Sequence, residues 1–216
     1  LDRCDEVEIY VGGLPKERRW PFEYKAGFAP YDVLEEYTRP ARVVVDGEVV
    51  VKEALSEPEL LDFPGVGHLE AFNTDGLRSL LDTLDVPCRL EKTLRYPGHI
   101  ELMRVLRHVG FFDEQPVELA PVGGRGSSDE ARSIVPRELT AALLFPKWTF
   151  EPGEADLTVM RIMARGEKDG APLQQRYELH DAYDAPTQRT SMSRTTGFPA
   201  AIVARYLAHG RLSRPG

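Results

Sequence analysis

Hydrophobic residues make up 42% and charged residues 29% of the 216-residue chain, which is typical of a globular domain with a substantial core. The formal net charge of −8 disfavours nucleic acid or an anionic membrane as a partner, and no apolar run approaches the ~20 residues that span a bilayer. The two cysteines, Cys4 and Cys88, have the spacing of neither a disulfide framework nor a metal site, so without a signal peptide we expect a cytoplasmic protein with reduced, buried thiols and no bound metal.

The first predicted strand covers residues 7–11 and ends at Gly12 and Gly13. A glycine pair permits either a positive φ or close passage of the backbone past another group. The pair lacks the spacing and the Lys-Ser/Thr sequel of a phosphate-binding loop.

The aromatic segment 20–30 is predicted to be an ordered loop. It forms either a small core beneath the loop or one wall of a substrate pocket. Pro30 suits the first turn of a short helix over residues 31–37, whose inward residues are Val33, Leu34 and Tyr37.

Residues 41–51 are predicted to form a β-hairpin, because Asp46-Gly47 lies between two β-branched runs. A strand over residues 68–72 follows and leads into a predicted helix over residues 73–84. Asn73 or Thr74 would cap this helix, and Asp75 in its first turn would suit the helix dipole. Its predicted inward stripe is Leu77, Leu80, Leu81 and Leu84.

The main polar junction follows a predicted strand over residues 88–96, which ends at Pro97-Gly98. Arg95 stands at the carboxyl end of this strand, where open α/β layers usually bind ligands, and its planar fork suits a carboxylate. The alternative is an arginine in a surface ion pair. His99, beside it, is the one histidine that we consider as a proton donor or acceptor, the alternative being a solvated histidine at a helix start.

A helix is predicted over residues 99–109 and is closed by Gly110, with an inward stripe of Leu102, Met103, Leu106 and Val109. The composition of residues 121–130 is that of a flexible linker. Residues 136–145 are predicted to form a short helix, and its inward residues are Leu139, Leu143 and Leu144.

Two long strands are predicted over residues 156–165 and 173–182, joined by the turn at Asp169-Gly170. The alternating Leu157, Val159 and Met163 need a covering surface, which a helix layer or a second subunit could supply. A last helix is predicted over residues 195–209, and its small residues Ala200, Ala201 and Ala204 would allow close approach of a neighbour.

No pattern of a serine hydrolase, a zinc protease, a Cys/His-rich metal site or a nucleotide-binding phosphate loop occurs in the chain. The residues alone therefore predict an α+β domain with a polar junction suited to an anion. Because the chain starts without Met and ends just after a helix, we also expect an excised domain of a longer protein.

Four motifs in order resemble the C-terminal, substrate-binding and dimerisation domain of saccharopine dehydrogenases, of the glutamate-forming type and their bacterial relatives. The motifs are Gly12-Gly13-Leu14-Pro15, Tyr24-Lys25, Thr93-Leu94-Arg95-Tyr96-Pro97-Gly98-His99 and Thr195-Thr196-Gly197-Phe198-Pro199-Ala200. The similarity covers nearly the whole chain, with the motifs in the same order.

The resemblance implies an α+β fold like the C-terminal domain of glyceraldehyde-3-phosphate dehydrogenase. Its mixed, mostly antiparallel sheet would have about six strands, with helices on one face and a bare face available to a two-fold partner, so a homodimer is expected. Residues 1–194 would form the substrate-binding and dimerisation domain, and residues 195–216 would return to a Rossmann domain that lies mostly upstream.

The implied reaction belongs to lysine metabolism and is the reversible oxidation of the secondary amine of saccharopine. Hydride passes to NAD or NADP, and hydrolysis of the imine gives L-glutamate and 2-aminoadipate 6-semialdehyde. The cofactor would be bound mainly by the missing domain, so we expect the chain to be inactive on its own.

The family resemblance also implies substrate residues, whereas the catalytic proton relay is unknown. Thr93, Leu94 and Arg95 match the substrate segment, in which Arg95 would bind a carboxylate and Thr93 would add a hydroxyl or backbone contact. Lys25 belongs to the Tyr-Lys motif. Ala29 takes the place of a cofactor-contacting serine.

Two further departures from the family pattern bear on the substrate. Val11 replaces a cysteine of the fungal members, so a thiol role there is lost. A second substrate arginine of the family falls near Asp75, and Arg78 could substitute for it. The substrate could therefore be another amino acid conjugate, as in carboxynorspermidine dehydrogenase and homospermidine synthase. A non-enzymatic module for dimerisation or ligand binding is the remaining alternative.

Overall fold

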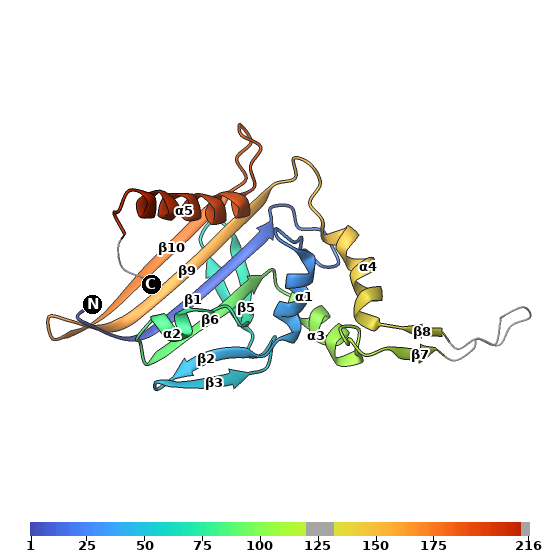
Figure 1. Cartoon of the computed structure of the whole chain (residues 1–216), viewed down its shortest axis with the longest axis horizontal. Helices are drawn as coiled ribbons and strands as arrows, with labels where there is room; N and C mark the ends of the chain where they lie inside the picture. Colours follow the sequence, from blue (N-terminus) through green and yellow to red (C-terminus); the bar gives the residue numbers. More distant parts are fainter. Residues whose placement is uncertain (120–131, 213–216) are drawn as a thin grey trace, which may run out of the picture.

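One mixed eight-stranded sheet organises residues 1–119 and 132–212, which are the residues that this computed structural model describes (Figure 1). The strands are β1 (Arg3–Pro15), β2 (Ala41–Val45), β3 (Glu48–Lys52), β4 (Glu59–Phe63), β5 (Gly67–Asn73), β6 (Cys88–Arg95), β9 (Asp156–Lys168) and β10 (Ala171–Ala182). A separate pair consists of β7 (Val117–Leu119) and β8 (Arg132–Ile134). The helices are α1 (Pro30–Thr38), α2 (Leu80–Thr83), α3 (His99–Val109), α4 (Pro136–Trp148) and α5 (Ser191–Ala208). The predicted linker 121–130 lies outside the described residues.

The two central strands, β1 and β6, run parallel, with Ile9 opposite Glu91 and Val11 opposite Thr93. The strand order is β10-β9-β1-β6-β2-β3, and β5 joins β4 to the carboxyl half of β6. Every neighbouring pair other than β1 and β6 is antiparallel. The predicted mixed, mostly antiparallel sheet is therefore confirmed. It has eight strands rather than about six, and the sequence analysis did not predict β4.

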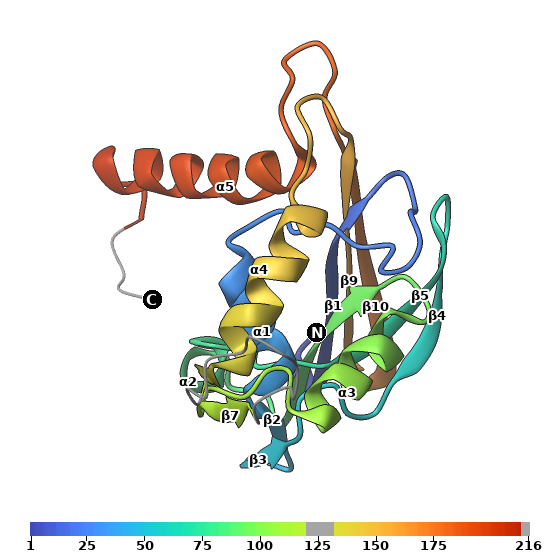
Figure 2. The same cartoon turned by 90° about the vertical axis from the view of Figure 1, so that its right-hand side faces the viewer.

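The sheet separates two hydrophobic clusters. On one face, Phe72 packs with α1, α3, α4 and the aromatic loop, around Tyr37 and Trp148. On the other face, Leu94 and Tyr10 pack with Leu157, Val159, Phe63 and Leu69. The cover that Leu157 and Val159 were expected to need thus comes from the β4–β5 hairpin. Edge-on, α1, α4 and α5 lie on the same side of β1, β9 and β10 (Figure 2).

Strand β1 does not end at the glycine pair but runs through it to Pro15. Neither glycine has a positive φ, so close approach is the reason for the pair. A Cβ on Gly12 would stand 2.8 Å from both the Cβ and the carbonyl oxygen of Leu94. Gly12 therefore lets β1 pass close to the end of β6.

The helix predicted over residues 73–84 is wrong, because only Leu80–Thr83 is helical. Asn73 is the last residue of β5, and its amide donates to Ser56 and Glu57 instead of capping a helix. The Thr74 hydroxyl donates to Glu91, and Arg78 has a φ of 49°, which a continuous helix does not allow. These side chains hold a loop against the sheet.

Several other predicted elements are confirmed, but some of the residues predicted to be buried in them are exposed. Helix α1 buries Val33, Leu34 and Tyr37 as expected, and the 41–51 hairpin turns at Asp46-Gly47 as expected. In α3 the buried residues are His99, Ile100 and Met103, whereas Leu102 and Val109 are exposed. In α4 they are Thr140, Ala141, Leu144 and Trp148, whereas Leu139 and Leu143 are exposed.

Helix α5 begins at Ser191, four residues before the predicted start at Thr195. Thr190 caps it, and the Asp156 carboxylate accepts the backbone N–H groups of Ser191 and Met192. These contacts satisfy the N–H groups that a helix start leaves free.

The two cysteines, Cys4 and Cys88, are free thiols and are half-buried rather than buried as predicted.

Candidate functional site

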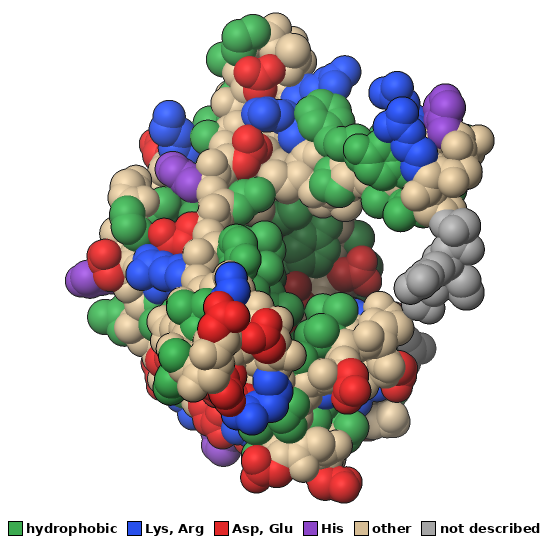
Figure 3. Space-filling view, turned by 90° about the vertical axis from the view of Figure 1, so that its left-hand side faces the viewer, with side chains coloured by type: hydrophobic (Ala, Val, Ile, Leu, Met, Phe, Trp, Pro, Cys, Tyr) green, Lys and Arg blue, Asp and Glu red, His purple; other side chains and the backbone are tan. Residues whose placement is uncertain are grey.

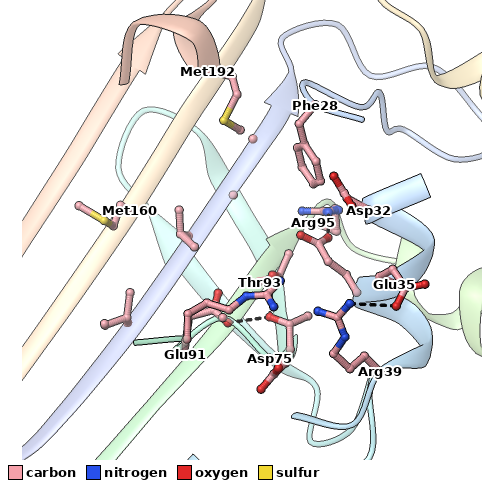
Figure 4. Close-up of a pocket in the computed structure, with 18 of the residues that line it drawn as sticks. Phe28, Asp32, Glu35, Arg39, Asp75, Glu91, Thr93, Arg95, Met160 and Met192 are labelled. Carbon is pink, nitrogen blue, oxygen red and sulfur yellow. Dashed lines mark hydrogen bonds and ion pairs between the residues drawn. The ribbon is translucent and has the colours of Figure 1, made fainter. Parts of the chain in front are cut away.

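A cavity of about 510 Å³ opens on the sheet face that carries α1 and α5. Its floor comes from alternate residues of β1, β6 and β9, and its walls come from α1 and from the loop between β5 and α2 (Figure 4). In the space-filling view, hydrophobic and acidic side chains meet in a hollow beside α5 (Figure 3).

Strand β6 contributes the polar part of the floor through Glu91, Thr93 and Arg95. These residues share a face because side chains alternate along a strand. Leu94 points the other way into the second cluster, where it is fully buried. Of the predicted segment Thr93-Leu94-Arg95, the cavity therefore receives the side chains of Thr93 and Arg95, and a side-chain contact of Leu94 with a ligand is not supported.

Arg95 is an ion-paired arginine, as the alternative interpretation held, but it is 2% exposed and not at the surface. Its Nη2 lies 2.7 Å from Oε2 of Glu36, and its Nη1 donates to the Leu94 carbonyl at 3.0 Å. The guanidinium carbon also lies 4.4 Å from the centre of the Tyr24 ring. Because burial disfavours a charged carboxylate, the pKa of Glu36 is raised despite Arg95.

His99 lies behind Arg95 and does not line the cavity. Its Nδ1 is 2.9 Å from the Phe22 carbonyl, which can only accept, so Nδ1 carries the proton and Nε2 accepts from the Tyr37 hydroxyl at 2.8 Å. Burial, with Arg95 nearby, lowers the pKa of His99 to about 3, so the ring is neutral. This geometry does not support His99 as the proton relay. It positions Tyr37, whose oxygen is 3.4 Å from Nε of Arg95.

Glu91 is the functional candidate that the sequence analysis missed. It is 5% exposed, and its Oε2 accepts the Thr74 hydroxyl at 2.7 Å, while that hydroxyl lies 2.8 Å from the Thr93 hydroxyl. Burial raises the pKa of Glu91 to about 7, and the bond from Thr74 opposes that rise. Alternation along β6 was a usable signal, because it places Glu91 on the same face as Thr93 and Arg95.

Asp75 and Arg78 both line the cavity, but they differ in availability. The Asp75 carboxylate is bound by Arg42 of β2 at 2.9 Å through both Nε and Nη2, and these hydrogen bonds lower its pKa. Arg78 is exposed and forms no ion pair with the described residues. Arg78 is therefore the lining cation most available to a ligand carboxylate.

Lys25 and Ala29 do not reach the cavity. Lys25 is ion-paired with Glu154 and donates to the Thr149 carbonyl, so it holds the aromatic loop to the segment before β9. Ala29 is exposed at the N-cap of α1, where Phe28 rather than Ala29 lines the cavity. Of the aromatic segment 20–30, which was expected to form either a small core or a pocket wall, Phe28 lines the cavity.

Helix α1 presents its polar face to the cavity because its residues divide by helical spacing. Val33, Leu34 and Tyr37 enter the core, whereas Asp32, Glu35, Glu36 and Arg39 line the cavity.

In the described ranges, no group of three or more His, Cys, Asp or Glu side chains could hold a metal ion. Nor is any helix there long and apolar enough to cross a membrane.

Comparisons with known proteins identify one family and one structure of similar fold. The family model described as saccharopine dehydrogenase C-terminal domain matches residues 1–216. Among solved structures, the apo, histidine-tagged saccharopine dehydrogenase (L-Glu forming) from Saccharomyces cerevisiae is similar, with a TM-score of 0.72 and 18% identity. The match covers 99% of this chain and 61% of that chain, so the chain spans about three fifths of its structural neighbour. At this identity the neighbour supports the fold alone.

Proposed function

Because the chain belongs to the saccharopine dehydrogenase C-terminal domain family, we propose that it is the substrate-binding and dimerisation part of an NAD(P)-dependent oxidoreductase acting on saccharopine. The reaction is the reversible conversion of saccharopine to L-glutamate and 2-aminoadipate 6-semialdehyde. One observation carries the proposal: the family-matching segment places Thr93 and Arg95 together on the floor of a cavity.

In this proposal a substrate carboxylate takes the place of Glu36 at the Arg95 guanidinium. The exchange is favoured because burial, which raises the pKa of Glu36, makes its charged carboxylate less stable beside Arg95 than a solvated carboxylate would be. The Thr93 hydroxyl and the exposed Arg78 offer further contacts to the same ligand. A planar guanidinium binds a carboxylate through two parallel hydrogen bonds, which fixes the direction of the ligand as well as its position.

The described residues do not fit a complete dinucleotide. None of their strand-to-helix junctions has a glycine-rich phosphate loop, and Ala29 offers only a methyl group at the exposed start of α1. We therefore assign NAD or NADP to a separate domain of a longer protein. The length of the structural neighbour, of which this chain covers 61%, is consistent with that assignment.

The homodimer is also part of the proposal. Strand β10 is a 12-residue edge strand, and Tyr177 on it is exposed. A long edge strand favours pairing with another strand. The face of β1 and β9 that points away from the cavity carries charged side chains, because Arg165 is ion-paired with Glu6 and Glu8 there. The edge of β10 is therefore a better candidate for the two-fold contact than that face.

Calorimetric titration of saccharopine into the chain tests the proposal. Replacing Arg95 by Lys keeps the charge beside Glu36 but removes the planar fork, so we expect binding to weaken by about 1.5–3 kcal/mol. Arg107→Lys is the matched control, because Arg107 lies outside the cavity and donates to the Ala54 carbonyl. Absence of saccharopine binding, or equal binding by both variants, would contradict the proposal.

A second candidate is an amine dehydrogenase of the carboxynorspermidine or homospermidine type. It is favoured by the charges that line the cavity, which has five acidic residues, Asp32, Glu35, Glu36, Asp75 and Glu91, and three basic ones, Arg39, Arg78 and Arg95. A ligand richer in amines than saccharopine would complement this lining. A non-enzymatic module would bind saccharopine as well, and only NAD(P) reduction by the longer protein distinguishes it from an enzyme.

A further inference from the structure

Glu91 and Asp32 are the two acidic lining residues that form no ion pair with the described residues, and of the two only Glu91 is buried, whereas Asp32 is exposed. Glu35 pairs with Arg39 and Arg137, Glu36 pairs with Arg95, and Asp75 pairs with Arg42. Glu91 is only 5% exposed, and it forms no ion pair within 4.0 Å in residues 1–119 and 132–212. A buried carboxylate without a counter-charge is costly, so its occurrence on a cavity floor points to a partner from outside the chain.

The surroundings of Glu91 hold the carboxylate in one place. A hydrogen-bonded chain runs from the Thr93 hydroxyl to the Thr74 hydroxyl and on to Oε2 of Glu91. The backbone of Gly76 passes so close that a Cβ there would stand 2.0 Å from the same oxygen. The site is therefore prepared for a charged group rather than left to adapt to one.

We propose that Glu91 binds a protonated amine of the ligand, at the opposite end of the cavity floor from the carboxylate at Arg95. The Cα atoms of the two residues are four steps apart along an extended strand, which corresponds to about 13 Å. The ligand is thus an elongated amino compound with an ammonium group at one end and a carboxylate at the other. The Arg95 end rests on the proposed function, whereas the Glu91 end can be tested without it.

The charged groups around Glu91 make amine binding depend on pH. Glu36 of α1 raises its pKa, and Arg95 of the same strand lowers it, both less than burial and the Thr74 bond do. The remaining charged residues of the walls are Asp32, Glu35 and Arg39 of α1 and Asp75 and Arg78 of the loop, whereas β1 and β9 contribute Ile9, Val11, Met160 and Ile162, which do not titrate. With a pKa of about 7, the ionised fraction of Glu91 rises about tenfold from pH 6 to pH 8.

The test is calorimetric titration of the chain with spermidine, which carries ammonium groups and no carboxylate. Alkyl ammonium groups stay protonated over this range, so we expect about tenfold tighter binding at pH 8 than at pH 6. Glu91→Gln should weaken binding at pH 8 at least tenfold and remove the pH dependence. Asp32→Asn removes the same charge from the rim of the cavity and should weaken binding less than threefold.

Spermidine that does not bind, or that binds Glu91→Gln as well as the unmodified chain, would overturn the proposal. So would equal losses in Glu91→Gln and Asp32→Asn, since they would indicate a general attraction to negative charge. If Glu91→Gln did not fold, Thr74→Val would serve instead, because it removes the hydroxyl that holds the carboxylate and should weaken spermidine binding at least threefold.

Saccharopine titrated in parallel keeps the two proposals apart. Failure of saccharopine to bind, with spermidine binding lost in Glu91→Gln, contradicts the proposed substrate and supports the amine site. Saccharopine binding that needs Arg95 but not Glu91 supports the proposed function and overturns the amine site.

Discussion

At the scale of single residues, the unpaired carboxylate of Glu91 should make the stability of the chain depend on pH. Its pKa is about 7 in the folded chain against 4.5 when unperturbed, so the folded state favours the protonated form. The stabilisation that this proton gives is complete below the unfolded pKa and is lost as the pH rises through 7. Burial of Glu91 therefore destabilises the ligand-free chain most at alkaline pH.

Glu91→Gln should accordingly stabilise the ligand-free chain more at pH 8 than at pH 5, by about 2–3 kcal/mol. Urea unfolding at the two pH values measures the difference. Glu101→Gln is the control, because Glu101 is an exposed glutamate on α3 and should give the same small effect at both pH values. A pH-independent effect of Glu91→Gln would mean that the carboxylate is solvated.

The sequence predicted the position of a site residue correctly where that position depends only on the residues next to it in one strand. The position of Arg95 at the end of β6 was evident from Pro97-Gly98, and its place on the cavity floor follows from that. Its partner Glu36 lies 59 residues away on another element, which sequence spacing does not reveal. His99 was misjudged for the same reason, since its burial against Phe22 and Tyr37 depends on the tertiary fold.

At the scale of elements, the two glycines of β1 should differ in their tolerance of a side chain. A Cβ on Gly12 would meet the backbone oxygen of Leu94, whereas one on Gly13 would meet only the methyl end of the Met192 side chain. The Leu94 backbone cannot move without shifting β6, whereas the end of the flexible Met192 side chain can move aside.

Gly12→Ala should therefore cost about 1–3 kcal/mol of unfolding free energy, and Gly13→Ala less than about 1 kcal/mol. Urea unfolding of the two variants makes the comparison. Because β6 carries Thr93 and Arg95, Gly12→Ala should also weaken ligand binding. Equal stabilities would show that the close approach of β1 and β6 is relaxed in solution.

Elements with clear local signals were predicted well, and those fixed by side-chain contacts across the fold were not. The turn at Asp46-Gly47 and the cap at Gly110 identified the β2–β3 hairpin and the end of α3. The segment 73–84 has a leucine spacing typical of a helix, yet the hydrogen bonds of Asn73 and Thr74 hold most of it as a loop. That loop forms a wall of the cavity, so the error concerned the part of the chain nearest to the site.

For the whole molecule, the cavity and α5 lie on the same side of the sheet, so a partner that covers α5 would also close over the site (Figure 2). Of the α5 side chains only Ser191 is buried, while Phe198, Ile202 and Tyr206 are each more than 40% exposed. The family resemblance implied that this helix returns to another domain, but nothing in its own spacing showed how little of it packs on the sheet.

The proposed cofactor domain is the partner that we expect to cover α5, and hydrogen exchange can test this. An 18-residue helix with Gly197 and Pro199 inside it is marginal without tertiary packing, whereas its start is fixed by the bonds of Ser191 and Met192 to Asp156. In the chain alone, amides after residue 200 should exchange within minutes, while those of β1 and β6 stay protected for hours.

In a longer protein that joins this chain to the cofactor domain, the same α5 amides should gain at least about a hundredfold protection, because packing then opposes local unfolding. The exposed strand β3 provides an internal control that should not change. Ile202→Glu should leave unfolding of the chain alone unaltered, since Ile202 is 49% exposed, but should remove the added protection. Equal exchange of α5 in both proteins would assign the apolar surface of this helix to a different contact.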